Sequence, residues 1–118
     1  MENFQDRRQH KRVEGSFEVF VNIEPESPEN FYCISKDISE GGMRIRTPKP
    51  LKNGNHIILS FDLPNYAWKI TTQGVVAWAS GTPKEDGSYE SGVRFLFMND
   101  LEKEAVCNYI ALHSEKIV

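Results

Sequence analysis

The sequence has few cysteines and no long hydrophobic run. Cys33 and Cys107 are its only cysteines and lie far apart, so we expect both thiols to be free, as in a cytoplasmic protein. The longest clearly apolar stretch, Ile57-Ile58-Leu59, is much shorter than the roughly 18 residues of a membrane-spanning helix. The first residues also lack the cationic and then apolar pattern of a signal peptide. The sequence therefore predicts a cytoplasmic protein with no membrane insertion.

The motifs of common enzymes and metal sites are missing too. The cysteines and histidines form no Cys-x-x-Cys or His-x-x-x-His pair, so no zinc site is indicated. Ser39 stands in an Asp-x-Ser-x-x-Gly frame and not in the Gly-x-Ser-x-Gly elbow of a hydrolase. The glycine-rich loops that hold ATP or NAD are absent as well. These absences favour a binding protein over an enzyme, with no catalytic residues, no metal and no cofactor.

What the sequence does contain is the composition of one globular domain. Its 118 residues allow a single ordinary core, and 39% hydrophobic and 11% aromatic residues are enough to fill it. Fourteen Lys and Arg against seventeen Asp and Glu give a net charge of −3, which argues against a broadly basic surface for nucleic acid. We also expect no room for an output domain, so that any signal would pass to a separate protein.

Alternating apolar residues predict a mainly β fold. In the first such segment Phe17, Val19, Val21 and Ile23 face one way, as a half-buried strand requires. Turn residues rich in Gly, Pro and Asn separate this segment from five others. The strand candidates are residues 16–24, 31–36, 43 onward, 56–61, 67–79 and 89–97. Short strands at this spacing, with no helical pattern between them, predict an antiparallel barrel or sandwich.

Both ends of the chain depart from the strand pattern. Asn99 can cap a helix that has Glu102 at its third position, and apolar residues follow at helical spacing, so we expect a C-terminal helix from about residue 99. The first dozen residues are polar and carry Arg7, Arg8 and Arg12. We therefore divide the chain into a flexible Arg-rich arm at residues 1–12 and a barrel domain with its helix at residues 13–118.

The arginines of this arm are one of two candidate binding features. Arg8 and Arg12 form an Arg-x-x-x-Arg pair, with Arg7 immediately before it. A solvated basic tail would explain such a cluster. Alternatively, guanidinium groups can bind phosphate with two parallel hydrogen bonds, match the O6 and N7 acceptors of guanine, and stack on a base.

The second feature is the segment Asp37-Ile38-Ser39-Glu40-Gly41-Gly42, expected to be a loop between two strands. The simpler interpretation is a turn in which the Asp and Ser side chains bond the local backbone. The functional alternative is that the carboxylate accepts the N1–H and N2–H₂ donors of guanine, while the serine hydroxyl bonds the ligand and Gly42 admits it. Together, the two features suit an anionic guanine nucleotide.

At these residues the chain resembles the PilZ domain family, whose members carry Arg-x-x-x-Arg and then Asp/Asn-x-Ser-x-x-Gly. The segments Gly74-Val75-Val76-Ala77-Trp78 and Ser91-Gly92-Val93-Arg94-Phe95 also resemble the late strands of the family. The resemblance implies a six-stranded antiparallel β-barrel from a bacterium that binds the second messenger cyclic di-GMP.

The resemblance also implies roles for individual residues. Arg8 and Arg12 would hold phosphates and guanine, Asp37 and Ser39 a guanine edge, and Gly42 would shape the loop. Arg7 resembles a family variant that binds a stacked ligand dimer. Trp78 is a weaker candidate, because a tryptophan in a small barrel more often lies in the core. Arg44 and Arg46 would extend the basic surface or lie on a solvated strand face.

We therefore expect a cyclic di-GMP receptor or adaptor with a role in motility and biofilm formation, in which the ligand orders the arm and alters a surface read by a partner protein. Two alternatives stay open. One is an adaptor that acts on motility or pilus machinery without a nucleotide. The other is a small barrel that binds single-stranded nucleic acid, against which the net charge argues.

Overall fold

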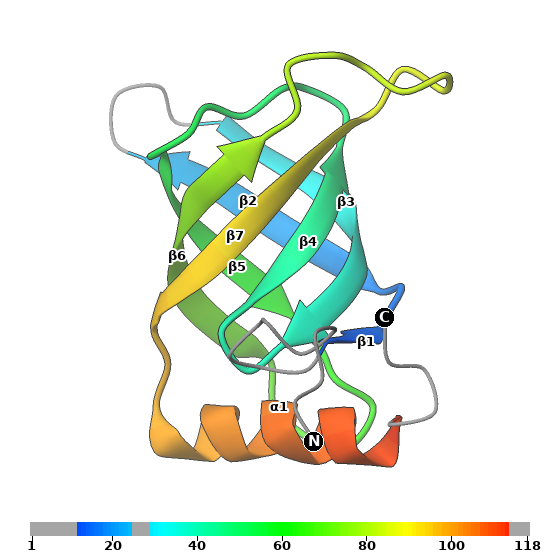
Figure 1. Cartoon of the computed structure of the whole chain (residues 1–118). Coiled ribbons are helices and arrows are strands. Elements are labelled where there is room, and N and C mark those ends of the chain that lie inside the picture. The colour runs from blue at the N-terminus through cyan, green and yellow to red at the C-terminus, as the bar shows by residue number, and fades with distance from the viewer. Residues whose placement is uncertain (1–11, 25–28, 114–118) are drawn as a thin grey trace, which may run out of the picture.

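The computed structural model describes residues 12–24 and 29–113, which form seven strands and one helix (Figure 1). The order along the chain is β1 (Arg12–Glu14), β2 (Glu18–Glu24), β3 (Glu29–Ser39), β4 (Gly42–Thr47), β5 (His56–Phe61), β6 (Ile70–Ala79), β7 (Tyr89–Phe97) and α1 (Asp100–Leu112). Among these residues, no helix is long and apolar enough to cross a bilayer.

Six strands close into an antiparallel barrel, as the sequence predicts. The order is β3, β2, β5, β6, β7, β4, and pairing of β4 with β3 closes the sheet. Every pair is antiparallel, and the register shifts where bulges interrupt β3–β4 and β6–β7. Closure leaves no free edge in the six strands and fixes the positions of side chains that are far apart in sequence.

The core forms because each strand alternates inward and outward side chains. Val19 and Val21 of β2, Ile57 and Leu59 of β5, and Ile45 of β4 are all almost fully buried. The same alternation places polar residues such as Asn22 of β2 and Ser60 of β5 toward the outside of the barrel. This packed interior makes the barrel a rigid scaffold for the side chains on its outer surface.

The seventh strand, β1, was not expected. It pairs with the end of β3, on the same edge where β2 pairs with the earlier part of β3. Arg12 lies opposite Ser39, and Val13 lies opposite Ile38. Between β1 and β2 the hydroxyl of Ser35 donates to the carbonyl oxygen of Gly15 and accepts the N–H of Phe17. Arg12, which the sequence assigns to the arm, therefore begins this strand. The rest of the predicted arm, residues 1–11, lies outside the described residues.

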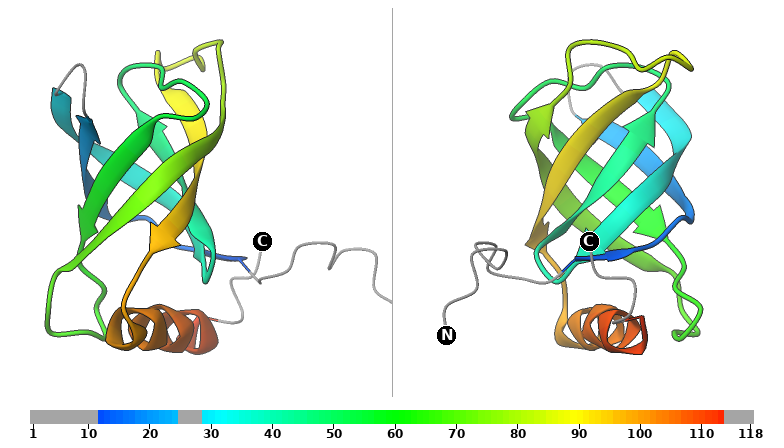
Figure 2. Two further views of the ribbon diagram at one scale, coloured as in Figure 1. Left: turned by 90° about the vertical axis from the view of Figure 1, so that its left-hand side faces the viewer. Right: turned by 45° about the vertical axis from the view of Figure 1, so that its right-hand side comes forward.

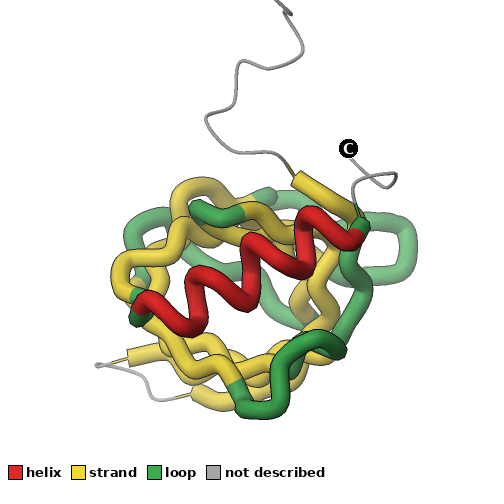
Figure 3. Tube along the Cα trace, turned by 90° about the horizontal axis from the view of Figure 1, so that it is seen from below, coloured by secondary structure: helices red, strands yellow, loops and turns green. Residues whose placement is uncertain are grey.

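Helix α1 crosses one end of the barrel (Figures 2 and 3). The side chain of Asn99 accepts the N–H of Glu102 and the side chain of Glu102 accepts the N–H of Asn99, which is the predicted capping box. The helix buries Ala105, Val106 and Tyr109 against the barrel. The hairpin between β3 and β4 lies at this same end, and the loops after β4 and β6 lie at the other (Figure 1).

Candidate functional site

The Asp-x-Ser-x-x-Gly segment forms a tight hairpin between β3 and β4. We expected a loop from Asp37 to Gly42, but β3 continues through Ser39 and β4 begins at Gly42. The strand is longer than predicted because its last residues pair with both β1 and β4. Only Glu40 and Gly41 remain for the turn, so Asp37 and Ser39 project from a strand of the barrel, which positions them rigidly.

Asp37 is held by two arginines from the neighbouring strands. Nη1 of Arg12 donates to Oδ1 of Asp37 at 2.7 Å, and Nη2 of Arg44 lies 2.9 Å from Oδ2. The Asp37 side chain is only 2% exposed. A buried carboxylate needs such partners, because removing it from water without them costs several kcal/mol, of order 3 to 5. The carboxylate of Asp37 therefore bonds two arginines. The simpler interpretation predicts bonds to the local backbone instead.

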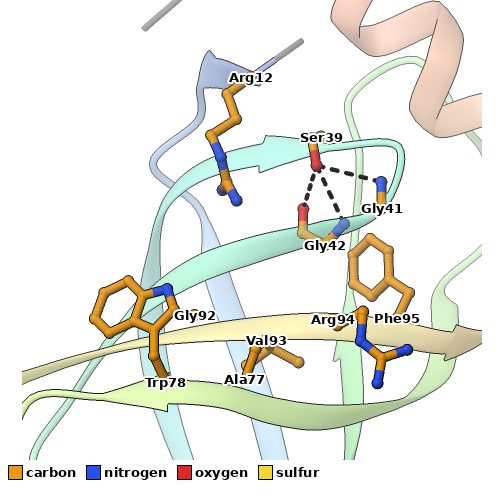
Figure 4. Close-up of a pocket in the computed structure, with 10 residues that line it drawn as sticks. All are labelled: Arg12, Ser39, Gly41, Gly42, Ala77, Trp78, Gly92, Val93, Arg94 and Phe95. Atoms are coloured by element: carbon orange, nitrogen blue, oxygen red, sulfur yellow. Dashed lines mark hydrogen bonds between the residues drawn. The ribbon is translucent and has the colours of Figure 1, made fainter. Parts of the chain in front are cut away.

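Ser39 does bond the local backbone. Its Oγ accepts the N–H groups of Gly41 and Gly42, both at 3.2 Å, and donates to the carbonyl oxygen of Gly42 at 3.3 Å (Figure 4). Gly42 has no room for a side chain, since a Cβ there would lie 2.1 Å from the carbonyl oxygen of Val93. Ser39 and Gly42 thus fix the close approach of the hairpin to β7.

A cavity of about 480 Å³ lies between this hairpin, β1 and the paired strands β6 and β7. Its lining residues are Arg12, Ser39, Gly41, Gly42, Ala77, Trp78, Gly92, Val93, Arg94 and Phe95 (Figure 4). Four of the residues predicted from the sequence are therefore brought together: Arg12, Ser39, Gly42 and Trp78. Asp37 is not part of the lining but is ion-paired to Arg12, which is. Arg7 and Arg8 lie outside the described residues.

Trp78 lies at the wall of this cavity and not in the core. Its side chain is 42% exposed and is seated on Gly92, its partner residue across β6 and β7. A Cβ on Gly92 would lie 2.1 Å from the indole Nε1, so only glycine permits this packing. The indole therefore presents an aromatic surface to the cavity, a position that the core interpretation would have excluded.

Sequence reasoning missed the contribution of β7. We noted the stretch from Ser91 to Phe95 only for its resemblance to a family strand, yet Gly92, Arg94 and Phe95 all line the cavity. Arg94 makes no ion pair with any residue that the structure describes. The sequence does not show the register of β7 on β4. Arg94 lies beside the hairpin because it pairs with Gly42, over fifty residues earlier in the chain.

A charged cluster on the outer face adjoins the site through Arg44. Nη1 of Arg44 lies 4.0 Å from Oε1 of Glu90, whose Oε2 lies 3.0 Å from Nζ of Lys36 and 3.5 Å from that of Lys84. Burial raises the pKa of Glu90, but the hydrogen bond and charge of Lys36 and the charges of Lys84 and Arg44 outweigh it, so the pKa is lowered. Glu90 is therefore a fixed negative charge among three cations.

The hairpin also contacts α1. Sγ of Cys107 donates to Oε2 of Glu40 at 3.1 Å, which links the helix to the turn of the Asp-x-Ser-x-x-Gly segment. Both cysteines are free, as the sequence predicts. Within residues 12–24 and 29–113, no group of three or more His, Cys, Asp and Glu side chains could hold a metal ion.

One family model matches most of the chain. The PilZ domain model matches residues 6–112, a span that includes the arm arginines, the hairpin and the helix. The chain belongs to the PilZ domain family. A comparison with curated protein sequences finds no match.

Solved PilZ structures share the fold at low sequence identity. The inhibitor of motility MotI/DgrA from Bacillus subtilis superposes with a TM-score of 0.78 at 21% identity over 98% of this chain and 57% of its own. The PilZ domain of YcgR from Escherichia coli, solved with c-di-GMP, gives 0.71 at 17% identity over 93% of each chain. PlzA from Borreliella burgdorferi, in complex with c-di-GMP, gives 0.62 at 18% over 89% of this chain and 41% of its own. The chain thus spans little more than half of the Bacillus subtilis protein.

Proposed function

We propose that this protein is a bacterial cyclic di-GMP receptor that acts as an adaptor and not as an enzyme. One observation carries the proposal: Arg12, Ser39, Gly42 and Trp78 come from different parts of the chain and line a single cavity. The presence of c-di-GMP in the PilZ structures from Escherichia coli and Borreliella burgdorferi supports the choice of ligand. The proposed location is the bacterial cytoplasm.

The chemistry of the cavity suits the two parts of this ligand. Cyclic di-GMP has two negative phosphates and two planar guanines. Arg12 and Arg94 supply positive charge on two sides of the cavity, and a guanidinium can bond a phosphate through two donors at once. Trp78 supplies a surface on which guanine can stack, and such stacking contributes about 1 to 3 kcal/mol per base.

Ligand binding would exchange the ion pair of Asp37 and Arg12 for bonds to the ligand. Arg12 turns toward phosphate and guanine, together with Arg8 of the arm, and Asp37 accepts the N1–H and N2–H₂ donors of guanine. The ligand thereby orders the arm against the barrel. Ordering about six arm residues costs roughly 1 to 2 kcal/mol each, which offsets much of the hydrogen bonding. We therefore expect a dissociation constant of micromolar order.

The signal would leave through a partner protein that reads the surface formed by the ordered arm. The inhibitor of motility from Bacillus subtilis is one of the similar structures, which supports a link to motility. Arg7, next to the Arg8 and Arg12 pair, would admit a second cyclic di-GMP stacked on the first.

Calorimetric titration with cyclic di-GMP tests the proposal. We expect wild type to bind two ligands per chain, Arg7→Ala to bind one, and Arg12→Ala to bind at least tenfold more weakly. Lys52→Ala is the control, because it also removes one positive charge but lies in the exposed loop at the other end of the barrel. Absence of heat with wild type, or equal binding by Arg12→Ala and Lys52→Ala, would reject the proposed site.

A further inference from the structure

We infer that Arg44 is a positioning residue of the ligand site, one that holds the Asp37 carboxylate in place when Arg12 moves to the ligand. This inference rests on the proposed function, since it assumes that cyclic di-GMP binds beside Asp37. Arg44 does not line the cavity, so it acts through Asp37 and not by touching the ligand.

The two oxygens of Asp37 have different partners. Oδ1 bonds Arg12, at the start of β1, while Oδ2 bonds Arg44, in the middle of β4. Arg44 stands directly opposite Asp37 in the pairing of β3 with β4, inside the closed barrel sheet. Arg12 adjoins the arm, whereas Arg44 is fixed by strands on both sides. The partner at Oδ2 is therefore the one that stays in place when Arg12 turns to the ligand.

Glu90 holds Arg44 from its other end. The guanidinium lies between the carboxylates of Asp37 and Glu90, which stand 2.9 Å and 4.0 Å from its terminal nitrogens. Because Glu90 is itself paired with Lys36 and Lys84, its negative charge is shared and does not pull Arg44 away from Asp37. The cluster on the outer face thus orients Arg44.

The consequence appears when the ligand binds. Once Arg12 turns to the phosphates, Asp37 would be a buried carboxylate with no cation if Arg44 were absent. Leaving one member of a buried ion pair uncompensated is strongly unfavourable. Without Arg44, Asp37 would hold Arg12 more tightly and withhold it from the ligand. Arg44 therefore releases Arg12 for binding and leaves Oδ1 free to accept a guanine donor.

Arg46 provides a closely matched control. It lies two residues further along β4, on the same face, and its side chain is 38% exposed against 36% for Arg44. In both residues Nε is buried without a hydrogen-bond partner among the described residues. Arg46, however, faces Asp86, at 3.8 Å, and not Asp37. Arg44→Gln and Arg46→Gln thus remove equal charge from side chains of nearly equal exposure, and only the first deprives Asp37 of a partner.

The experiment is a double-mutant cycle, read by calorimetry with cyclic di-GMP. We expect Arg44→Gln to raise the dissociation constant about tenfold and Arg46→Gln to change it less than twofold. Arg44→Lys should restore part of the affinity by returning the charge. In the Asp37→Asn background, Arg44→Gln should change the constant less than twofold, because a neutral amide needs no counter-charge. The Asp/Asn alternative in the family motif indicates that this background still binds.

The two proposals fail in different ways. If wild type gives no heat, the proposed function is wrong. If wild type binds but Arg44→Gln binds equally well, or loses the same factor in the Asp37 and Asp37→Asn backgrounds, then Arg44 does not act through Asp37 and the inference is wrong. If Arg44 acted only on the stability of the fold, Arg44→Gln would weaken binding by the same factor in both backgrounds and would lower the unfolding temperature.

Discussion

At the scale of single residues, the site depends on glycines that leave room for other groups. Gly42 allows the hairpin to approach β7, and Gly92 allows the indole of Trp78 to lie on that strand. Neither glycine has the positive φ that would explain it by backbone conformation, since such values occur only at Gly54 and Gly87 among the described residues. Both positions therefore need glycine because a side chain would not fit. A sequence pattern does not distinguish such a glycine from one that a turn requires.

Gly42→Ala should destabilise the barrel. The added methyl would meet the carbonyl oxygen of Val93 at 2.1 Å, and this neighbour is backbone that cannot rotate away. We expect a loss of about 1 to 3 kcal/mol in the free energy of unfolding, measured by chemical denaturation. Gly81→Ala is the control, because a Cβ at Gly81 meets nothing within 4 Å. Equal stability of the two variants would contradict the packing described for the hairpin.

At the scale of elements, α1 and the β3–β4 hairpin meet at Cys107 and Glu40. Burial, the hydrogen bond to Glu40, and the charges of Glu40 and Glu104 raise the pKa of Cys107 to about 11. Because a raised thiol pKa lowers the fraction of reactive thiolate, Cys107 should react slowly with iodoacetamide at pH 8. Cys33 should be slower still, since burial raises its pKa to about 12.

Glu40→Gln should accelerate the alkylation of Cys107 severalfold, because the variant removes both a charge and the carboxylate acceptor and so lowers the thiol pKa. Glu104→Gln removes only the smaller effect of charge and should change the rate less. Mass spectrometry of the peptide that contains Cys107 measures both rates. Equal acceleration by the two variants would mean that the helix and the hairpin are not joined through Glu40.

The elements also show what the sequence can predict. β5 and β7 have the expected bounds because turn residues flank a clear alternation, and α1 begins where Asn99 and Glu102 indicate. β1 and the end of β3 were not predicted, because neither has its own periodic signal. β1 forms by pairing with β3, and the end of β3 pairs with both β1 and β4. The position of Arg94 beside Gly42 likewise depends on the closure of the barrel, which local patterns do not contain.

At the scale of the whole molecule, charge is distributed unevenly. The net charge of −3 is an average over regions of opposite sign: residues 7–12 carry four basic side chains, while residues 13–35 carry five glutamates and no Lys or Arg. The barrel then gathers Arg12, Arg44 and Arg94, from three strands, around one hairpin. An anion site can therefore form on an acidic protein, because local potential governs binding more than total charge does.

The most direct test of the central claim is an amide NMR titration with cyclic di-GMP. The account predicts shifts of the backbone N–H signals of Gly41 and Gly42 and of the indole N–H of Trp78, all at the cavity. The backbone N–H signal of Gly87, in the loop after β6 at the far end of the barrel, should not move. No shift at Gly41, Gly42 and Trp78, or a larger shift at Gly87, would contradict the site.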